Sequence, residues 1–259
     1  MNPMGRLREY VELIFWKAMA ELHAEAARAY IGILWWIVEP TLYMLAFYLA
    51  FGLGVRGGGE QMVFFLLCGL VPWKWFLSGV QNGSGSIQAN SGLIQQVYLP
   101  KLVLPLIIIF TNTIKFLIVL ALLMLVLALY GHGPDVTWLA LPAMIAVELL
   151  LIVAAGSLTA AILPIFPDVK LVVDNGLMVL MFVSGVFFDL SKLPPKAQAV
   201  LHYNPLIPVF EGYRAVLLRH EWPDWEGLGW VCAVGVVMYA AAVWILVAYD
   251  RRYIKLMIS

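Results

Sequence analysis

Apolar residues in this chain occur in long runs that are separated by short polar segments. A transmembrane helix needs roughly 20 apolar residues to cross a hydrocarbon core of about 30 Å. Six stretches meet that requirement: residues 34–55, 62–80, 102–130, 138–162, 171–188 and 228–249. The pattern predicts an all-α, polytopic membrane protein with six transmembrane helices. An even number of spans places both ends of the chain on one side of the membrane.

The distribution of lysine and arginine indicates which side that is. More of these residues fall near the two termini and in the loops on their side, among them Lys101, Lys170 and Arg251, than on the other side. Cytoplasmic segments carry such an excess of positive charge. We therefore predict a membrane domain over residues 34–249, with both termini in the cytoplasm and residues 250–259 as a cytoplasmic tail.

The N-terminal residues 1–33 form a different kind of pattern. Between residues 6 and 28, apolar positions recur at helical spacing, and the pairs Arg8–Glu12 and Lys17–Glu21 are spaced for i,i+4 ion pairs. This pattern is typical of an amphipathic helix that lies in the membrane interface with its apolar face toward the lipids. A soluble helix packed on a partner protein is the alternative.

Residues 81–101 hold more structure than a connection between two spans requires. They begin with the polar run 81–86, continue as a predicted helix and end at Leu99-Pro100-Lys101. They lie on the side of the membrane with the excess of lysine and arginine, which is predicted to be the cytoplasm. We interpret this segment as a docking element for a protein outside the membrane.

Residues 190–227 form a second unusual loop, on the outer side. They contain two short apolar helical patterns, 196–201 and 208–218, which are separated by Tyr203-Asn204-Pro205. Each pattern is too short to cross a membrane, and prolines interrupt both. We expect a re-entrant helical hairpin that enters from the outer surface and is surrounded by protein or water.

Composition and missing motifs narrow the functional classes. Hydrophobic residues make up 63% of the 259 positions, and the formal net charge is zero, which argues against nucleic acid as a partner. Cys68 and Cys232 stand in separate apolar runs, so we expect buried thiols rather than a disulfide or a metal site. The sequence has no phosphate-binding loop of the GxxxxGK[ST] type, so energy from ATP must come from another protein.

An enzyme acting on lipid phosphates is the rival from another class. That chemistry needs clustered acids for Mg²⁺, or a histidine and arginine set. Asp168 and Asp174 are a close acidic pair at a membrane boundary, but no third acid or histidine stands near them. Transport is therefore favoured over catalysis, and no catalytic or metal site is predicted.

Charged residues within the apolar stretches are candidates for function because they are costly in a membrane. They are Glu39, Lys74, Lys115 and Glu148. Their depths predict an ion pair between Glu148 and Lys115. Aromatic residues gather in three of the predicted spans, where their rings could stack on the apolar faces of sugars or simply pack against other helices.

Several short motifs, in order along the chain, resemble the transmembrane subunits of ABC-2-type exporters, especially those that move polysaccharides. The motifs are Gly32-Ile33-Leu34-Trp35 with Glu39-Pro40, Gly69-Leu70-Val71-Pro72-Trp73, Asn90-Ser91 with Leu93-Ile94 and Val97-Tyr98, Phe166-Pro167-Asp168-Val169-Lys170, and Tyr203-Asn204-Pro205 with Glu211, Tyr213 and Arg214. The resemblance covers nearly the whole chain. It implies export of a lipid-linked polysaccharide such as O-antigen, capsule or teichoic acid across the bacterial inner membrane.

The resemblance also implies partners. Two copies of a separate ATP-binding subunit, which carries ATP and Mg²⁺, would dock on the cytoplasmic side, and this chain itself would hold no cofactor. Because six spans make a thin wall around a polymer, we expect a homodimer with the conduit on its two-fold axis. An ABC-2 exporter of a drug or small lipid is the alternative function.

Individual residues take expected roles from the same resemblance. Asp168 would cap the following span or contact the ATPase. Arg28 is the candidate for the lipid head group, although Glu25, Ala26 and Ala27 stand where the family usually has a basic cluster. The ATPase-coupling residues are Asn90, Ser91, Leu93, Ile94, Val97, Tyr98 and Asp168; the hairpin residues are Asn204, Pro205, Glu211, Tyr213 and Arg214. The aromatic residues expected along the conduit are Tyr43, Phe47, Trp73, Trp75, Phe76, Phe182, Phe187 and Phe188.

Overall fold

The apolar stretches form helices, as their length predicts. The computed structural model describes residues 3–28, 34–49, 59–92, 99–249 and 253, and these residues are helical with short connections and no β-strand. The all-α prediction is thus confirmed for the described part of the chain. The helices are α1 (Pro3–Arg28), α2 (Trp35–Phe47), α3 (Gly59–Ser84), α4 (Ser86–Ala89), α6 (Val103–Leu129), η3 (Val136–Ala140), α7 (Leu141–Ile162), α8 (Val169–Val183), η4 (Leu190–Lys192), α9 (Pro195–Leu201), α10 (Leu206–Arg214), η5 (Ala215–Arg219) and α11 (Trp225–Ala248).

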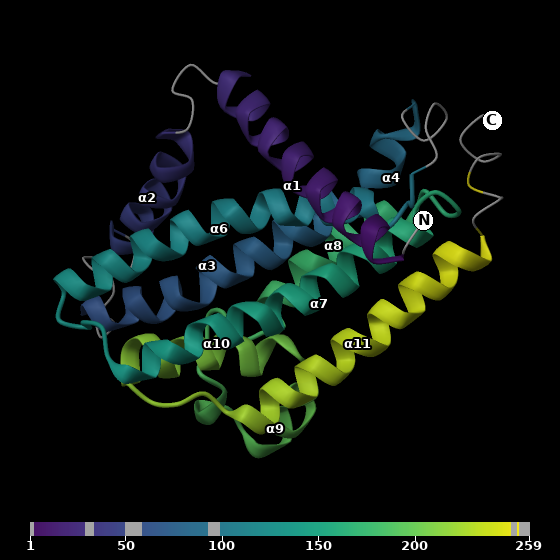
Figure 1. Ribbon diagram of the computed structural model, residues 1–259. Helices are drawn as coiled ribbons and strands as arrows, with labels where there is room; N and C mark the ends of the chain where they lie inside the picture. Colours follow the sequence, from purple (N-terminus) through teal and green to yellow (C-terminus); the bar gives the residue numbers. More distant parts are fainter. Residues whose placement is uncertain (1–2, 29–33, 50–58, 93–98, 250–252, 254–259) are drawn as a thin grey trace.

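Four segments of the described chain are long and apolar enough to cross a membrane: Glu60–Ser84, Val103–Leu129, Val136–Ile162 and Trp225–Ala248. They correspond to the predicted spans 62–80, 102–130, 138–162 and 228–249. Figure 1 shows the long helices of these segments side by side, with the start of α1 and the end of α11 at one end of the bundle and α9 and α10 toward the other. The chain is therefore a multi-pass membrane protein.

The other two predicted spans differ from the expectation. α2 begins at Trp35. The last residues of the predicted stretch 34–55, residues 50–55, lie outside the described residues. α8 has 15 residues, from Val169 to Val183, so it is about 22 Å long at 1.5 Å per residue. It ends before residue 188 because Gly185 adopts a positive φ of 76°, which turns the chain away from the helix axis.

α3 is the central helix of the bundle. It packs against both α6 and α7, and 78% of its most apolar stretch is buried inside the protein. The close approach to α7 depends on Gly79, because a Cβ at that position would lie 2.4 Å from Cγ2 of Ile152. α11 packs along α7 on the opposite side, and only 22% of its apolar stretch is buried.

The predicted N-terminal helix is confirmed as α1. It crosses α6 obliquely (Figure 1), and its residue Ala18 is fully buried against Val103 and Ile107 of α6. The Arg8 and Glu12 side chains form the expected ion pair at 2.8 Å. α1 thus contacts the bundle along one apolar stripe, and a role in the lipid interface stays a prediction.

The segment 81–101, which was predicted to be cytoplasmic, begins differently from the prediction. α3 continues to Ser84, and the short α4 follows it, with Ser84 and Ile87 fully buried. Ile87 packs against Leu104 and the partly described C-terminal tail, where the Tyr253 hydroxyl donates a hydrogen bond to the Ala161 carbonyl at 2.6 Å. The first part of this segment therefore packs as part of the bundle, because Ile87 is buried in an apolar cluster. The polar residues around Ile87 had indicated an exposed segment instead.

The segment 190–227, which was predicted on the outer side, contains the two short helices that were predicted. They are α9 and α10, and α10 continues as the π-helix η5 before the chain turns at His220, whose φ is +56°. α10 packs against α3 and α7. One helix of the hairpin is therefore enclosed by the long helices rather than lying on their surface.

Candidate functional site: a charged cavity and an anchored outer hairpin

A cavity of about 290 Å³ opens between the end of α1, α2, α3 and α6. Its walls are mainly aromatic and aliphatic side chains, which include Trp35, Trp36, Tyr43, Leu67, Trp75 and Phe116. Ser78, Asn82 and Asn112 add polar groups. Two lysines and two glutamates complete the lining, so the cavity combines apolar surface with balanced charge.

Each lysine in the cavity is paired with a glutamate from another helix. Lys74 Nζ of α3 lies 3.0 Å from Glu39 Oε1 of α2 and 3.6 Å from the centre of the Tyr43 ring. Lys115 of α6 is paired with Glu25 of α1. Both cations are therefore neutralised by carboxylates, and the aromatic ring adds a further favourable contact for Lys74.

The predicted pair between Glu148 and Lys115 is wrong. Glu148 of α7 is fully buried and accepts a hydrogen bond at 2.9 Å from the Tyr213 hydroxyl of α10. Lys115 instead stands on the face of α6 that meets α1. Depth along a helix was a poor guide here because it does not say in which direction a side chain projects.

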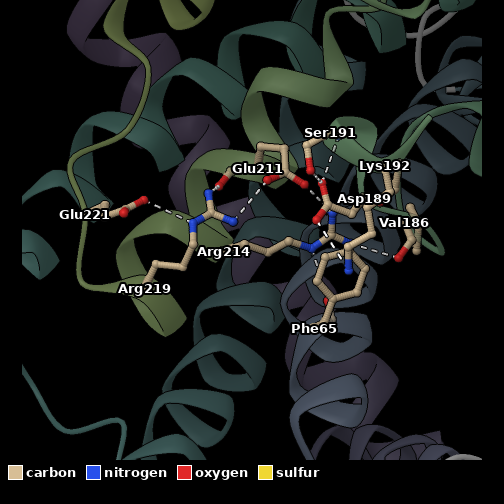
Figure 2. Close-up of polar contacts among 10 residues, drawn as sticks. Phe65, Val186, Asp189, Ser191, Lys192, Glu211, Arg214, Arg219 and Glu221 are labelled. Carbon is tan, nitrogen blue, oxygen red and sulfur yellow. Dashed lines mark hydrogen bonds and ion pairs between the residues drawn. The ribbon is translucent and has the colours of Figure 1, made fainter. Parts of the chain in front are cut away.

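Arg214 anchors the outer hairpin within the bundle. Its side chain is 1% exposed and donates to three backbone carbonyls: Gly185 at 2.8 Å, Val186 at 2.8 Å and Phe65 at 3.2 Å. Gly185 and Val186 follow the end of α8, where carbonyl groups have no partner within a helix. Figure 2 shows the guanidinium beside the Phe65 ring, whose centre is 3.6 Å from Cζ.

Gly69 makes room for this anchor. A Cβ at Gly69 would lie 2.5 Å from Nη2 of Arg214, so any larger residue would push the guanidinium away. The sequence analysis marked Arg214 only as a hairpin residue, and the structure shows that its side chain is 1% exposed. The sequence contains both residues, but it carries no signal that they meet.

Ion pairs extend from Arg214 toward the surface of the protein. Glu211 Oε1 accepts from Arg214 at 2.9 Å, and Glu211 Oε2 lies 3.2 Å from Arg219, which also pairs with Glu221 (Figure 2). Nearby, partial burial of Asp189 opposes its ionisation. Hydrogen bonds from the Ser191 hydroxyl and backbone N–H, together with nearby cations, outweigh that effect and hold the pKa of Asp189 below its usual value.

Asn204 connects the turn before α10 to the end of α8. Its amide donates to the Val183 carbonyl at 3.1 Å and to Ser184 Oγ at 3.0 Å, and its side-chain oxygen accepts from the Leu206 backbone N–H at 3.0 Å. Pro205 lies at the N-cap of α10. The structure thus brings four of the five predicted hairpin residues into hydrogen bonds that fix α10.

The aromatic residues predicted along a conduit fall into two groups. Trp73 and Phe76 are 1% and 5% exposed, and Trp73 packs against Phe76 and Phe210 inside the bundle. Trp75 is also buried and stacks on Phe116. In this structure these three side chains face protein rather than an open path, although Trp75 reaches the edge of the cavity.

The remaining aromatic residues of the set are more accessible. Tyr43 lines the cavity and is exposed, and Phe182 is exposed and stacks with the half-buried Phe187. Phe188 is half-buried. Phe47 ends α2, Arg28 ends α1, and their side chains lie outside what the structure describes. A role in the conduit stays a prediction for these positions.

The predicted coupling residues are only partly described. Asn90 is half-buried and donates to the Ser86 carbonyl at 2.8 Å, and Ser91 is half-buried too. Leu93, Ile94, Val97 and Tyr98 lie outside the described residues. Asp168 is exposed at the N-cap of α8 but makes no capping hydrogen bond, so the capping alternative is wrong.

The described residues define an all-helical, multi-pass membrane protein with charged side chains in its apolar helices. The family description "ABC-2 type transporter" matches residues 13–218. The chain belongs to this family, and it is a permease component rather than an enzyme.

Curated relatives agree with that assignment. The chain is 31% identical over 238 residues to an O-antigen export system permease protein of Myxococcus xanthus, with 91% of this chain and 92% of the relative covered. It is 29% identical over 213 residues to a polysialic acid transport protein of Escherichia coli, with 80% and 81% covered. It is also 23% identical over 252 residues to an inner membrane transport permease of E. coli K12, with 92% and 97% covered.

Proposed function

We propose that this chain is the membrane subunit of an ATP-driven exporter that moves a lipid-linked polysaccharide from the cytoplasm across the bacterial inner membrane. The observation that carries the proposal is the 31% identity to an O-antigen export permease over 91% of the chain. A second polysaccharide transporter among the relatives supports the same cargo class. The aromatic cavity beside α2 and α3 is compatible with stacking on sugar rings.

The proposal includes the membrane arrangement and the partners. The chain crosses the membrane six times, with α2 in the first span and α8 in the fifth, and both termini lie in the cytoplasm. Two copies of the chain form a dimer around the conduit. Two ATP-binding subunits, which hold ATP and Mg²⁺, dock against the segment 90–98 and the exposed Asp168.

Deletion of the chain in its host tests the cargo. Under the proposal, surface polysaccharide disappears and lipid-linked polysaccharide accumulates in the cytoplasm, and the wild-type chain restores export. A matched control uses the same strain with a hydrolysis-deficient ATP-binding partner, which should give the same accumulation. Unchanged surface polysaccharide, with loss of export of a drug or a small lipid instead, would reject the polysaccharide assignment.

Co-purification tests the docking surface. Leu93→Asp with Ile94→Asp would bury unpaired charge at the contact, so the ATP-binding subunit should be lost while insertion of the chain is unchanged. Gln95→Asp, a polar position of the same segment, is the matched control and should keep the partner. Normal co-purification of the double variant contradicts docking at this segment.

A further inference from the structure

Tyr253 lies beyond the end of α11, yet its side chain is fully buried. Its backbone N–H donates to the Tyr249 carbonyl at 3.2 Å, and its hydroxyl donates to the Ala161 carbonyl of α7 at 2.6 Å. The apolar cluster around Tyr253 also contains Ile87 of α4 and Leu104 of α6. Figure 1 shows α4 and the end of α11 toward the same end of the bundle. One cluster that includes a residue of the C-terminal tail therefore joins α4, α6, α7 and α11.

This cluster fixes the chain just before the segment 90–98, which is the proposed docking surface for the ATP-binding subunit. Ile87 is fully buried in the cluster. The neighbouring Gln88 Nε2 donates to the Leu163 carbonyl, just after the end of α7, at 3.3 Å. The beginning of the docking segment is therefore attached to α7 by an apolar contact and by a hydrogen bond.

The chain just after the segment 90–98 meets the same cluster. Leu99 and Leu102 are half-buried and pack against it. Lys101, which stands between them, is 7% exposed, and its Nζ lies 5.2 Å from the centre of the Tyr253 ring. Both ends of the docking segment are thus held in one place, and Tyr253 is a part of that place.

The cluster around Tyr253 is separate from the main core of the bundle. The main core is built from residues of α3, α6, α7, α10 and α11, and it contains none of the buried residues of the Tyr253 cluster. Loss of the Tyr253 ring should therefore release the ends of the docking segment while the main core stays packed.

We infer that Tyr253 is a positioning residue for the ATP-binding subunit. The cluster that it completes holds both ends of the segment 90–98, so that less of this segment has to be ordered when the complex forms. The inference rests on the proposed function, because it takes the segment 90–98 as the docking surface. It assigns the C-terminal tail to assembly of the exporter.

Binding of the ATP-binding subunit to the full-length chain in nanodiscs tests this role. Tyr253→Ala should raise the Kd by about tenfold, because the released segment must be ordered on binding. Tyr253→Phe keeps the ring and loses only the hydroxyl, so its Kd should lie between those of Tyr253→Ala and the wild type. Trp244→Ala removes a ring of α11 that is 69% exposed, and this matched control should bind as the wild type does. Wild-type affinity in Tyr253→Ala would overturn the inference.

The rate of ATP hydrolysis separates positioning from general damage to the fold. At saturating concentrations of the ATP-binding subunit, the complex with Tyr253→Ala should hydrolyse ATP at the wild-type rate, while half-saturation requires more of the subunit. A rate that stays low at saturation would overturn the inference, because Tyr253 would then affect more than assembly. If Tyr253→Ala does not fold, Tyr253→Phe carries the same two measurements.

A double-mutant cycle tests whether Tyr253 acts through the cluster. Ile87→Ala should also raise the Kd. Because both residues hold the same segment, the Kd of the double variant should rise by less than the product of the two single effects. Effects that multiply would mean that the two residues act independently, and this result would overturn the inference.

The variant Leu93→Asp with Ile94→Asp distinguishes failure of this inference from failure of the proposed function. If that variant loses the ATP-binding subunit while Tyr253→Ala keeps wild-type affinity, docking at 90–98 stands and the role of Tyr253 is rejected. If that variant binds normally, docking at this segment and the role of Tyr253 are both rejected. If Tyr253→Ala loses affinity but deletion of the chain leaves surface polysaccharide unchanged, the role of Tyr253 stands and the polysaccharide assignment is rejected.

Discussion

The hairpin and the cavity beside α1 and α2 both contain buried or half-buried cations, but these cations are neutralised in different ways. Arg214 is 1% exposed and is satisfied by three backbone carbonyls and Glu211. Lys74 and Lys115 are 38% and 24% exposed, and each has a single carboxylate partner. The backbone carbonyls that bind Arg214 cannot move away from it unless the local chain unfolds. A glutamate side chain can rotate away from its lysine while the backbone stays in place. The hairpin cation is therefore fixed in the core, whereas the two lysine–glutamate pairs of the cavity are partly open to solvent.

The largest expected effect comes from removing the hairpin anchor. Arg214→Met leaves Glu211 and the carbonyls after α8 without their partner, so the free energy of unfolding should fall by about 3–5 kcal/mol. Thermal unfolding of purified protein in detergent measures this. Arg219→Met, which removes a half-exposed ion pair from the same Glu211, should lower it by less than about 1 kcal/mol. Equal losses in the two variants would contradict the anchor.

Substitution of aromatic residues gives a second way to distinguish side chains of the buried core from side chains that line the cavity. Trp73→Ala should reduce stability by about 3 kcal/mol because it leaves a void among buried rings. Tyr43→Ala removes an exposed ring that lines the cavity, so its stability should change little while export falls. Thermal shift and polysaccharide export measured on the same variants give both values. A large loss of stability in Tyr43→Ala would show that α2 packs more firmly than its exposure indicates.

A smaller effect is expected for the contact between α7 and α10. Tyr213→Phe removes the hydroxyl that donates to the fully buried Glu148, and a buried group left without its hydrogen bond reduces stability by about 1–3 kcal/mol. Tyr203→Phe is the control, since Tyr203 is 72% exposed in the same hairpin. Denaturant unfolding should distinguish the two variants. Identical midpoints would mean that water or another group replaces the lost contact.

The sequence predicted the helical elements well because helix length and apolar content are local properties. α1, the four long spans and the two short helices α9 and α10 could all be placed from periodicity and proline positions. The ends of α3 and α8 were harder. The residues around Ile87 are polar and predict an exposed segment, but Ile87 itself is buried. α8 ends earlier than predicted because Gly185 adopts a positive φ.

The partners of the intramembrane charges could not be predicted, although the charges themselves could. Glu39, Lys74, Lys115 and Glu148 stand out in apolar stretches, yet their pairing depends on how helices rotate about their axes. That rotation is set by packing, for example by Gly79 against Ile152 and by Gly69 against Arg214. A single sequence contains the glycines, but it does not say which distant side chain each one admits.

The smallest expected effect is a pH dependence at the outer edge of the fixed hairpin. The native-state pKa of Asp189 is held below its ordinary value, so the folded protein binds a proton less readily there than the unfolded chain does. The stabilisation is therefore fully present above the ordinary aspartate pKa of about 4 and is lost as the pH falls through the lowered native value. Because the Asp189 side chain is 28% exposed, solvent screens part of its interactions and the contribution should stay below about 1 kcal/mol. Asp189→Asn should be slightly less stable than the wild type at pH 7, and the melting temperatures of the two should converge as the pH falls toward 3. A constant difference across that range would assign the contribution of Asp189 to hydrogen bonds that the asparagine cannot make, rather than to its charge.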